Sequence, residues 1–240
     1  MKILAIDTAT EACSVALWLD GELRERFAVA GREHSGLLPA MVHGLAADCG
    51  LRLGQLDGIV CGRGPGSFAG VRIGIAFAKG LALGLDRPAA GVSSLAMLAQ
   101  GAILRSGARQ VLAAIDARMG EIYWGVYVAA AGVALALIDE AVIPPSRATA
   151  PEPGEYAAAG SGWRAYEREL RRVLSTANIA DIEPDALPRA ADALPIALPL
   201  FAAGNAPDGA ALRPVYLRNR VALTSAEQAL ARAGRQQAEK

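Results

Sequence analysis

Leu4-Ala5-Ile6-Asp7-Thr8 lies near the start of the 240-residue chain and is nearly repeated by Ala113-Ala114-Ile115-Asp116-Ala117, about 109 residues later. Each stretch is an apolar run that ends in Asp, as buried strands often do, and a second strand is predicted after each, over 13–19 and 121–128. Two copies of this pattern predict an α/β chain made of two related halves. The alternative is a chance match of five residues in a chain rich in alanine.

The segment between the two copies predicts further strands and helices. After a hairpin turn at Asp20-Gly21, a third strand is expected over 22–30. Apolar side chains at helical spacing predict a helix over 36–49. A short strand over 58–61 and a helix over 71–85 flank a glycine-rich loop, and a strand over 90–92 and another helix follow.

The segment after the second copy is less regular. Pro and Ala predict a loop over 144–154, and charged residues predict an exposed helix over 164–174. Four prolines predict a broken helix over 181–199. We therefore expect an N-terminal lobe over 1–107 and a C-terminal lobe over 108–222, whose last helical part packs back on the first lobe, and we expect residues 223–240 to fray.

Charge and composition exclude several classes of protein. The chain has 24 basic and 24 acidic side chains, whereas binding nucleic acid by electrostatics alone needs a basic excess or patch. His34 and His43 are nine residues apart, and the three cysteines form no CxxC pair, so neither a metal site nor a disulfide framework is predicted. The uncharged stretch over 122–138 contains two glycines and predicts strand–turn–strand rather than a membrane span. We expect a cytoplasmic protein.

The loop Gly64-Pro65-Gly66-Ser67-Phe68-Ala69-Gly70 lies between a predicted strand and a predicted helix. Backbone N–H groups and the helix dipole can hold an anion at such a place. It is not a Walker A loop, because no Gly-Lys-Ser/Thr follows. Gly64, Gly66 and Ala69 match a relaxed dinucleotide-binding pattern, with Asp86 downstream, but the loop lies in mid-chain rather than at the first turn of a β-α-β series.

Asp7 and Asp116 end the two copies of the repeated pattern. In a nucleotide-binding fold with two related halves, such carboxylates position Mg²⁺ or water near phosphates, while hydroxyl and backbone N–H groups contact the oxygens. The alternative is that each Asp closes its turn with its own side-chain hydrogen bond. Arg118 also offers Asp116 an ordinary ion pair.

The predicted helix over 71–85 is unusually apolar. Its only charged residues are Arg72 and Lys79, seven residues apart on one stripe, and the mean hydropathy of the whole chain is +0.28. A helix with so little polar surface has to be covered on more than one side. Either its own sheet and the helix over 36–49 cover it, or another protein does.

Four motifs carry a family resemblance. They run over 3–10 (Ile-Leu-Ala-Ile-Asp-Thr-Ala-Thr), 62–74, 114–123 and 214–218. Together they resemble the TsaB (YeaZ) family of bacterial tRNA threonylcarbamoyladenosine biosynthesis subunits over nearly the whole chain, in the same order and spacing. One departure is Ala69, where the family usually has Thr. The resemblance implies an α/β fold of the duplicated actin/Hsp70/sugar-kinase (ASKHA) type, with two lobes that each carry a mixed β-sheet and flanking helices.

The resemblance also implies a function. On this resemblance, the chain looks like a catalytically idle paralogue of TsaD. TsaD is the subunit that transfers the threonylcarbamoyl group to adenosine 37 of tRNAs reading codons that begin with A. TsaD holds its metal with a His-x3-His pair, a spacing that His34 and His43 do not have. The chain would then be a scaffold without a cofactor that binds TsaD, with TsaE joining the complex. It would form a homodimer when alone and reach tRNA only indirectly.

The same resemblance implies where the sites lie. The family pairs through the first two helices of the N-terminal lobe, here 36–49 and 71–85. The expected partner interface is Leu38, Met41, Val42, Leu45, Val71, Gly74, Ile75 and Ala78. Asp7, Thr8, Gly64, Gly66, Ser67 and Asp116 become vestigial phosphate-binding candidates, and no catalytic residue is assigned. The alternative functions are a nucleotide-binding ATPase of the ASKHA type and, less favoured, a dinucleotide-binding enzyme.

Overall fold

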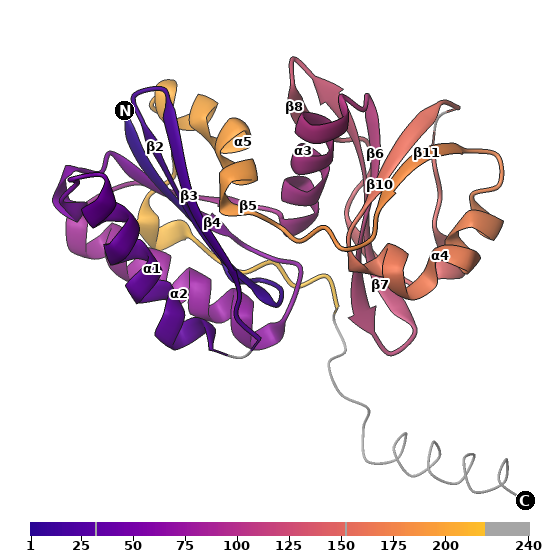
Figure 1. Cartoon of the computed structure of the whole chain (residues 1–240), viewed down its shortest axis with the longest axis horizontal. Helices are drawn as coiled ribbons and strands as arrows, with labels where there is room; N and C mark the ends of the chain where they lie inside the picture. The colour runs from indigo at the N-terminus through magenta and orange to yellow at the C-terminus, as the bar shows by residue number, and fades with distance from the viewer. Residues whose placement is uncertain (32, 152, 219–240) are drawn as a thin grey trace, which may run out of the picture.

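Two mixed β-sheets, one in each of two lobes that lie side by side, organise the chain (Figure 1). The computed structural model describes residues 1–31, 33–151 and 153–218. The layers follow one another across the molecule as α1 and α2, the first sheet, α5 and α3, the second sheet, and α4. The predicted α/β class with two sheet-containing lobes is confirmed.

The first sheet has the strand order β3-β2-β1-β4-β5. A β-meander supplies its antiparallel half, and two strands that run parallel to β1 complete it. The strands are β1 Lys2–Asp7, β2 Ala12–Leu19, β3 Glu22–Val29, β4 Gly58–Gly62 and β5 Ala89–Val92, and the short helix η1 Leu53–Gln55 precedes β4.

Both faces of the first sheet are buried because alternate residues of β1 enter two different cores. Leu4 and Ile6 pack under α1 His34–Asp48 and α2 Phe68–Leu85. Ile3 and Ala5 point the other way, into a core that α5 Ala190–Ala202 and α3 Ser94–Ser106 share with the second sheet. The apolar run of β1 therefore holds two layers of helices at once.

The second sheet has the order β11-β10-β6-β7-β8, and β9 also pairs with β7. α4 Ser161–Val173 covers one face, where Trp124 and Trp163 lie with ring centroids 6.2 Å apart. α3 covers the other face. The strands are β6 Gln110–Arg118, β7 Glu121–Ala130, β8 Val133–Ala136, β9 Ala141–Ile143, β10 Glu155–Ala159 and β11 Asn178–Glu183, and the remaining short helices are η2 Pro145–Arg147 and η3 Gly209–Ala211.

The chain returns to the first lobe after β11. The Ala190 N–H donates a hydrogen bond to the Ser14 hydroxyl on β2 (2.9 Å), and Arg189 pairs with Glu25 on β3. The broken helix predicted over 181–199 is wrong. β11 ends at residue 183, and α5 runs unbroken through Pro195 and Pro199, because buried side chains such as Leu194 hold it against the first sheet.

The last described residues cross between the lobes. The Val215 N–H donates to the Arg63 carbonyl of the first lobe (2.9 Å), and Arg218 pairs with Glu121 of β7 (2.6 Å). We call residues 213–218 the strap, because this stretch ties the N-terminal lobe to the β6–β7 hairpin. The tail predicted over 223–240 lies outside the described residues.

α2 has the length and apolar composition of a membrane span, with a hydropathy of 1.5 over 18 residues, of which 33% are buried. It packs on β4 and β1, however, so it is a core helix of the first lobe. Gly66, Gly70 and Gly74 bring it close to the end of β1. A Cβ at Gly70 would lie 2.1 Å from the Thr8 carbonyl oxygen, and one at Gly74 would lie 2.6 Å from the Thr8 hydroxyl.

Two Gly→Ala substitutions in α2 should change stability in opposite directions. Gly70→Ala should lower the free energy of unfolding by about 1–3 kcal/mol, because the new methyl group meets the Thr8 backbone. Gly80→Ala should raise it by about 0.8–1 kcal/mol, because a Cβ there meets no atom within 4 Å and Ala favours a helix. Urea unfolding of both variants checks the pair. Equal effects would contradict the close packing of α2 on β1.

Candidate functional site

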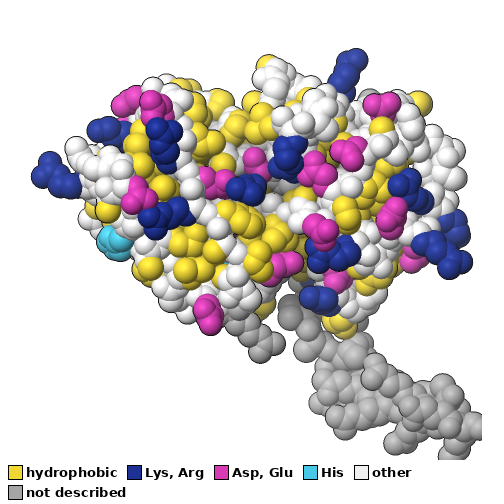
Figure 2. All heavy atoms as spheres, viewed as in Figure 1, with side chains coloured by type: hydrophobic (Ala, Val, Ile, Leu, Met, Phe, Trp, Pro, Cys, Tyr) yellow, Lys and Arg dark blue, Asp and Glu magenta, His cyan; other side chains and the backbone are white. Residues whose placement is uncertain are grey.

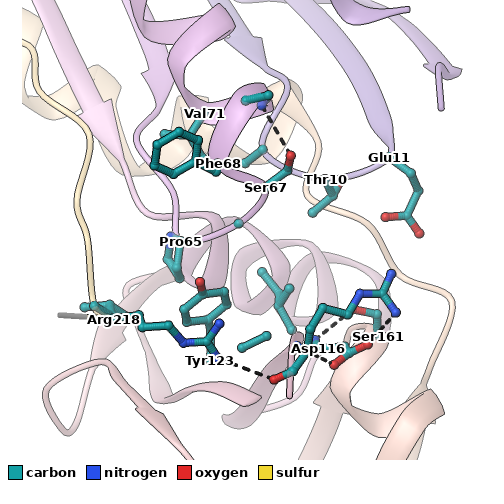
Figure 3. Close-up of a pocket in the computed structure, with 18 of the residues that line it drawn as sticks. Thr10, Glu11, Pro65, Ser67, Phe68, Val71, Asp116, Tyr123, Ser161 and Arg218 are labelled. Carbon is teal, nitrogen blue, oxygen red and sulfur yellow. Dashed lines mark hydrogen bonds and ion pairs between the residues drawn. The ribbon is translucent and has the colours of Figure 1, made fainter. Parts of the chain in front are cut away.

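A cleft of about 980 Å³ lies between the two lobes (Figure 3). Thr10, Ser67 and Phe68 come from the first lobe, and Asp116 and Ser161 face them from the second lobe (Figure 3). The strap closes one side of the cleft. This cavity collects some of the predicted phosphate-binding residues, so it is the natural place to test that prediction.

Asp7 does not line the cleft. Its side chain is fully buried at the end of β1, where Oδ1 accepts a hydrogen bond from the Ala9 N–H (3.1 Å). Oδ2 has no hydrogen-bond partner among the described residues and lies against Gly62, where a Cβ would come within 1.8 Å of it. Burial raises the pKa of Asp7 to about 7, although the Ala9 N–H lowers it in part. This carboxyl is enclosed between β1 and β4 rather than presented to a ligand.

The other candidates of the first lobe hold the loop in place. The buried Thr8 hydroxyl donates to the Gly70 carbonyl (2.8 Å), and the Ser67 hydroxyl accepts from the Gly70 N–H (3.3 Å), which caps α2. Gly64 is buried with a φ of +87°, a backbone conformation that favours glycine. Gly66 and Ser67 reach the cleft, whereas Thr8 and Gly64 do not line it.

Asp116 lies on the opposite wall of the cleft (Figure 3). Its Oδ1 accepts a hydrogen bond from the Arg118 N–H (2.8 Å), and its Oδ2 pairs with the Arg118 guanidinium (3.0 Å). Its own N–H donates to the Ser161 hydroxyl (3.1 Å). The Asp116 carboxylate therefore closes its own turn and also forms the ion pair with Arg118 that the sequence suggested. The structure brings Gly66, Ser67 and Asp116 to one cleft, but Asp7 stays apart from it.

The remaining reactive side chains do not converge. His34 is buried, with Nε2 3.2 Å from the Ala12 carbonyl, while His43 is exposed. Burial raises the pKa of the Cys13 thiol to about 11, and it raises the pKa of Cys61 as well. Within residues 1–31, 33–151 and 153–218, no cluster of three His, Cys, Asp or Glu side chains could hold a metal ion.

The predicted partner interface consists of core residues. Each of its eight members is buried, and each side chain except the glycine belongs to the cluster under α1 and α2. They are Leu38, Met41, Val42, Leu45, Val71, Gly74, Ile75 and Ala78. The strongest apolar periodicity marks the side of an amphipathic helix that faces its own sheet. These side chains are buried in the folded chain and form no open surface there, so pairing through them stays a prediction.

The opposite side of α2 is open and still apolar. Phe68 is 60% exposed and Leu83 is 58% exposed, and small or half-buried apolar residues lie between them. We define the outer face of α2 as its exposed residues Phe68, Ala69, Ala76, Gly80, Leu83 and Gly84. Ile73, Phe77 and Leu81 are half-buried beside it and pack against the core, and Arg72 and Lys79 are its charged neighbours on the helix. Figure 2 shows hydrophobic side chains gathered over the region that α1 and α2 occupy in Figure 1. The signal in the sequence was the near absence of polar residues around the helix.

A ring–arginine stack at the mouth of the cleft was not predicted from the sequence. The Arg72 guanidinium carbon lies 3.2 Å from the centroid of the Phe68 ring and 4.8 Å from that of Tyr216. The spacing of four residues between Phe68 and Arg72 was visible on the predicted helix. Tyr216 comes from the strap, and no sequence pattern placed it beside α2.

Comparisons with known proteins agree on one relationship. The family model described as TsaD, tRNA N6-adenosine threonylcarbamoyltransferase, matches residues 28–181. The chain is 45% identical to the Escherichia coli tRNA threonylcarbamoyladenosine biosynthesis protein TsaB, over 92% of this chain and 96% of the relative. The Haemophilus influenzae protein of the same name is 36% identical over 92% and 95%.

A solved structure extends the relationship to the fold. YeaZ from Pseudomonas aeruginosa superimposes with a TM-score of 0.85 at 41% identity, and the match covers 90% of this chain and 99% of that chain. With the two mixed sheets and their flanking helices, this match confirms the predicted two-lobed, ASKHA-like fold.

The buried Asp7 predicts a pH dependence of stability. Its pKa of about 7 in the folded protein lies above the ordinary value of 3.8, so folding favours the protonated form. The contribution of Asp7 to the free energy of unfolding should therefore be fully present below about pH 4 and be lost as the pH rises towards and through 7. A shift of about three pKa units corresponds to about 4 kcal/mol at most.

Asp7→Asn should make this fall less steep, because the amide does not titrate. The fall should not vanish, because burial also raises the pKa of Asp192 to about 7. Urea unfolding of both proteins between pH 5 and pH 8 measures the two slopes. Identical slopes would show that Asp7 does not titrate in this range.

Proposed function

The chain belongs to the TsaB family of tRNA threonylcarbamoyladenosine biosynthesis proteins, and from this premise we propose that it acts as a non-catalytic scaffold in that pathway. It would bind a TsaD subunit, which transfers the threonylcarbamoyl group to adenosine 37 of tRNA. TsaE would join the same complex. The observation that carries this proposal is the apolar outer face of α2, which the fold leaves open.

The outer face of α2 suits a helix-to-helix contact. A Cβ added at Gly80 or Gly84 would meet no atom within 4 Å, so a second helix can approach the backbone there. Phe68, Phe77 and Leu83 supply larger apolar side chains beside them. Each buried aliphatic or aromatic side chain contributes about 1.5–3 kcal/mol when it leaves water. We therefore propose a heterodimer with TsaD through α1 and α2, and a homodimer through the same face when TsaD is missing.

The engagement of the phosphate-binding candidates supports a non-catalytic role. Thr8 and Ser67 bind Gly70, Asp116 binds Arg118, and Asp7 is fully buried. A nucleotide-dependent ATPase would need such groups free to meet phosphate or Mg²⁺. The zero net charge supports an indirect route to tRNA through the partner. We also propose a cytoplasmic location, since α2, despite its hydropathy, packs on the first sheet.

Two substitutions on the outer face of α2 should weaken the complex and leave the fold intact. Ala76→Glu places a charge on the exposed apolar face, and Gly80→Leu fills the position where close approach is expected. Each should lower the affinity for TsaD from the same organism by roughly 100-fold, as at the centre of an interface. Isothermal titration calorimetry measures the affinity, and thermal unfolding checks the fold.

Ala180→Glu on the exposed β11 strand is the matched control, because it adds the same charge on the far lobe. It should bind like the wild-type chain. Ile75→Glu is not a suitable test, because Ile75 is 7% exposed and the charge would disrupt the core. If Ala76→Glu and Gly80→Leu both fold and bind TsaD with wild-type affinity, the proposed interface is wrong.

A further inference from the structure

Arg72 contacts Phe68 of α2 and Tyr216 of the strap, two residues that line the interlobe cleft. Its guanidinium carbon lies 3.2 Å above the Phe68 ring, and Nη1 donates a hydrogen bond to the Phe68 carbonyl (2.8 Å). The Tyr216 ring of the strap faces the same guanidinium at 4.8 Å. Stacking on aromatic rings favours a planar guanidinium and restricts its rotation. The side chain is therefore oriented before any ligand arrives.

The position of Tyr216 depends on both lobes. The Val215 N–H is bonded to the Arg63 carbonyl, and Arg218 pairs with Glu121 on β7. The strap is thus anchored to both lobes on either side of the Tyr216 ring that contacts Arg72. Phe68 and Tyr216 nevertheless remain 60% and 51% exposed. Two exposed aromatic rings around an arginine are an arrangement that the fold itself does not need.

Arg72 has no acidic partner in the described part of the chain. Ten ion pairs are formed there, and none includes Arg72. By contrast, Arg118, Arg164 and Arg218 around the same cleft are paired with Asp116, Asp185 and Glu121. An oriented guanidinium offers a fork of N–H donors that fits a carboxylate or a phosphate. Arg72 is therefore available to an anionic group from outside the described chain.

We propose that Arg72, with Phe68 and Tyr216, is the anchor that receives an Asp or Glu side chain of the protein docked on the outer face of α2. This inference rests on the proposed function, because it assigns a charged contact to that interface. Arg72 lies one helical turn before Ala76, so the anchor continues the apolar outer face. Arg, Tyr and Phe are also the residue types enriched in protein interfaces.

A tRNA phosphate is the other anion with the right chemistry, but it fits the surroundings less well. RNA binding draws on several unpaired cations along a groove. Here the neighbouring arginines of the cleft are already neutralised by carboxylates of the same chain. Arg72 and Lys79 lie seven residues apart on α2, and the exposed apolar residues beside them fit a protein surface that carries a carboxylate better than an RNA backbone. The affinity for TsaD reports on a partner carboxylate, and the KM of the assembled complex for tRNA reports on an RNA phosphate, so the two measurements distinguish the two anions.

The experiment measures the affinity of the full chain for TsaD of the same organism by isothermal titration calorimetry. Arg72→Ala should weaken binding roughly 30-fold, because a partner carboxylate loses its hydrogen-bonded cation. Arg72→Lys keeps the charge but not the planar fork of N–H donors. Its affinity for TsaD should therefore lie between that of the wild-type chain and that of Arg72→Ala. Phe68→Ala removes the stacking ring and should also weaken binding. Arg109→Ala, an exposed arginine at the start of β6, is the control and should bind like the wild-type chain.

Each outcome decides a different point. Wild-type chain that does not bind TsaD overturns the proposed function and this inference together. Wild-type binding with an unchanged affinity for Arg72→Ala overturns this inference alone. If Arg72→Ala binds TsaD normally but raises the KM of the assembled complex for tRNA, the ligand is an RNA phosphate and the carboxylate anchor is wrong. Thermal unfolding of each variant checks that it still folds. We expect Phe68→Ala to fold, because the Phe68 side chain is largely exposed.

Discussion

The close approach of α2 to the end of β1 is the contact on which the rest of the structure depends. Gly66, Gly70 and Gly74 lie against Thr8 and Ala9 at distances that leave no room for a side chain. The Thr8 hydroxyl and the Ser67 cap then hold the first turn of the helix. α2 packs on the sheet with Gly70, Gly74 and Ala78 together with Val71 and Ile75, and it leaves Phe68, Leu83 and several small residues on the outer side. One packing constraint thus produces both the closed loop and the open outer face.

This constraint also explains why the loop resembles a phosphate-binding loop without presenting its polar groups. The Thr8 hydroxyl and the Ser67 N–H join the loop to the segment that follows β1, and the Ser67 hydroxyl caps α2. Asp7, at the centre of this junction, is buried with its pKa raised to about 7. A carboxyl in that state is a cost to stability at neutral pH. The site is organised for holding α2 in place, which suits a helix that another protein contacts.

The two lobes are joined by more than the linker between them. α3 and α5 share one core between the two sheets, and the strap crosses from Arg63 to Glu121. A partner that binds α2 and the ring–arginine stack would therefore touch the strap as well. Its contact would depend on the geometry of both lobes, although the apolar face belongs to the first. This arrangement connects the proposed interface to the cleft between the lobes.

The class of fold could be predicted from local patterns, because apolar strands that end in Asp and helices with regular apolar spacing are patterns that burial enforces. The sequence also marked α2 as a helix with too little polar surface. Only the tertiary structure decided which side of α2 is covered. Ile75 and Ala78 pack inwards while Ala76 and Gly80 stay open, since periodicity marks two sides of a helix without saying which one faces a partner. The continuity of α5 through its two prolines and the contact between Tyr216 and Arg72 also became visible only in the tertiary structure. Both depend on contacts between residues far apart in the chain.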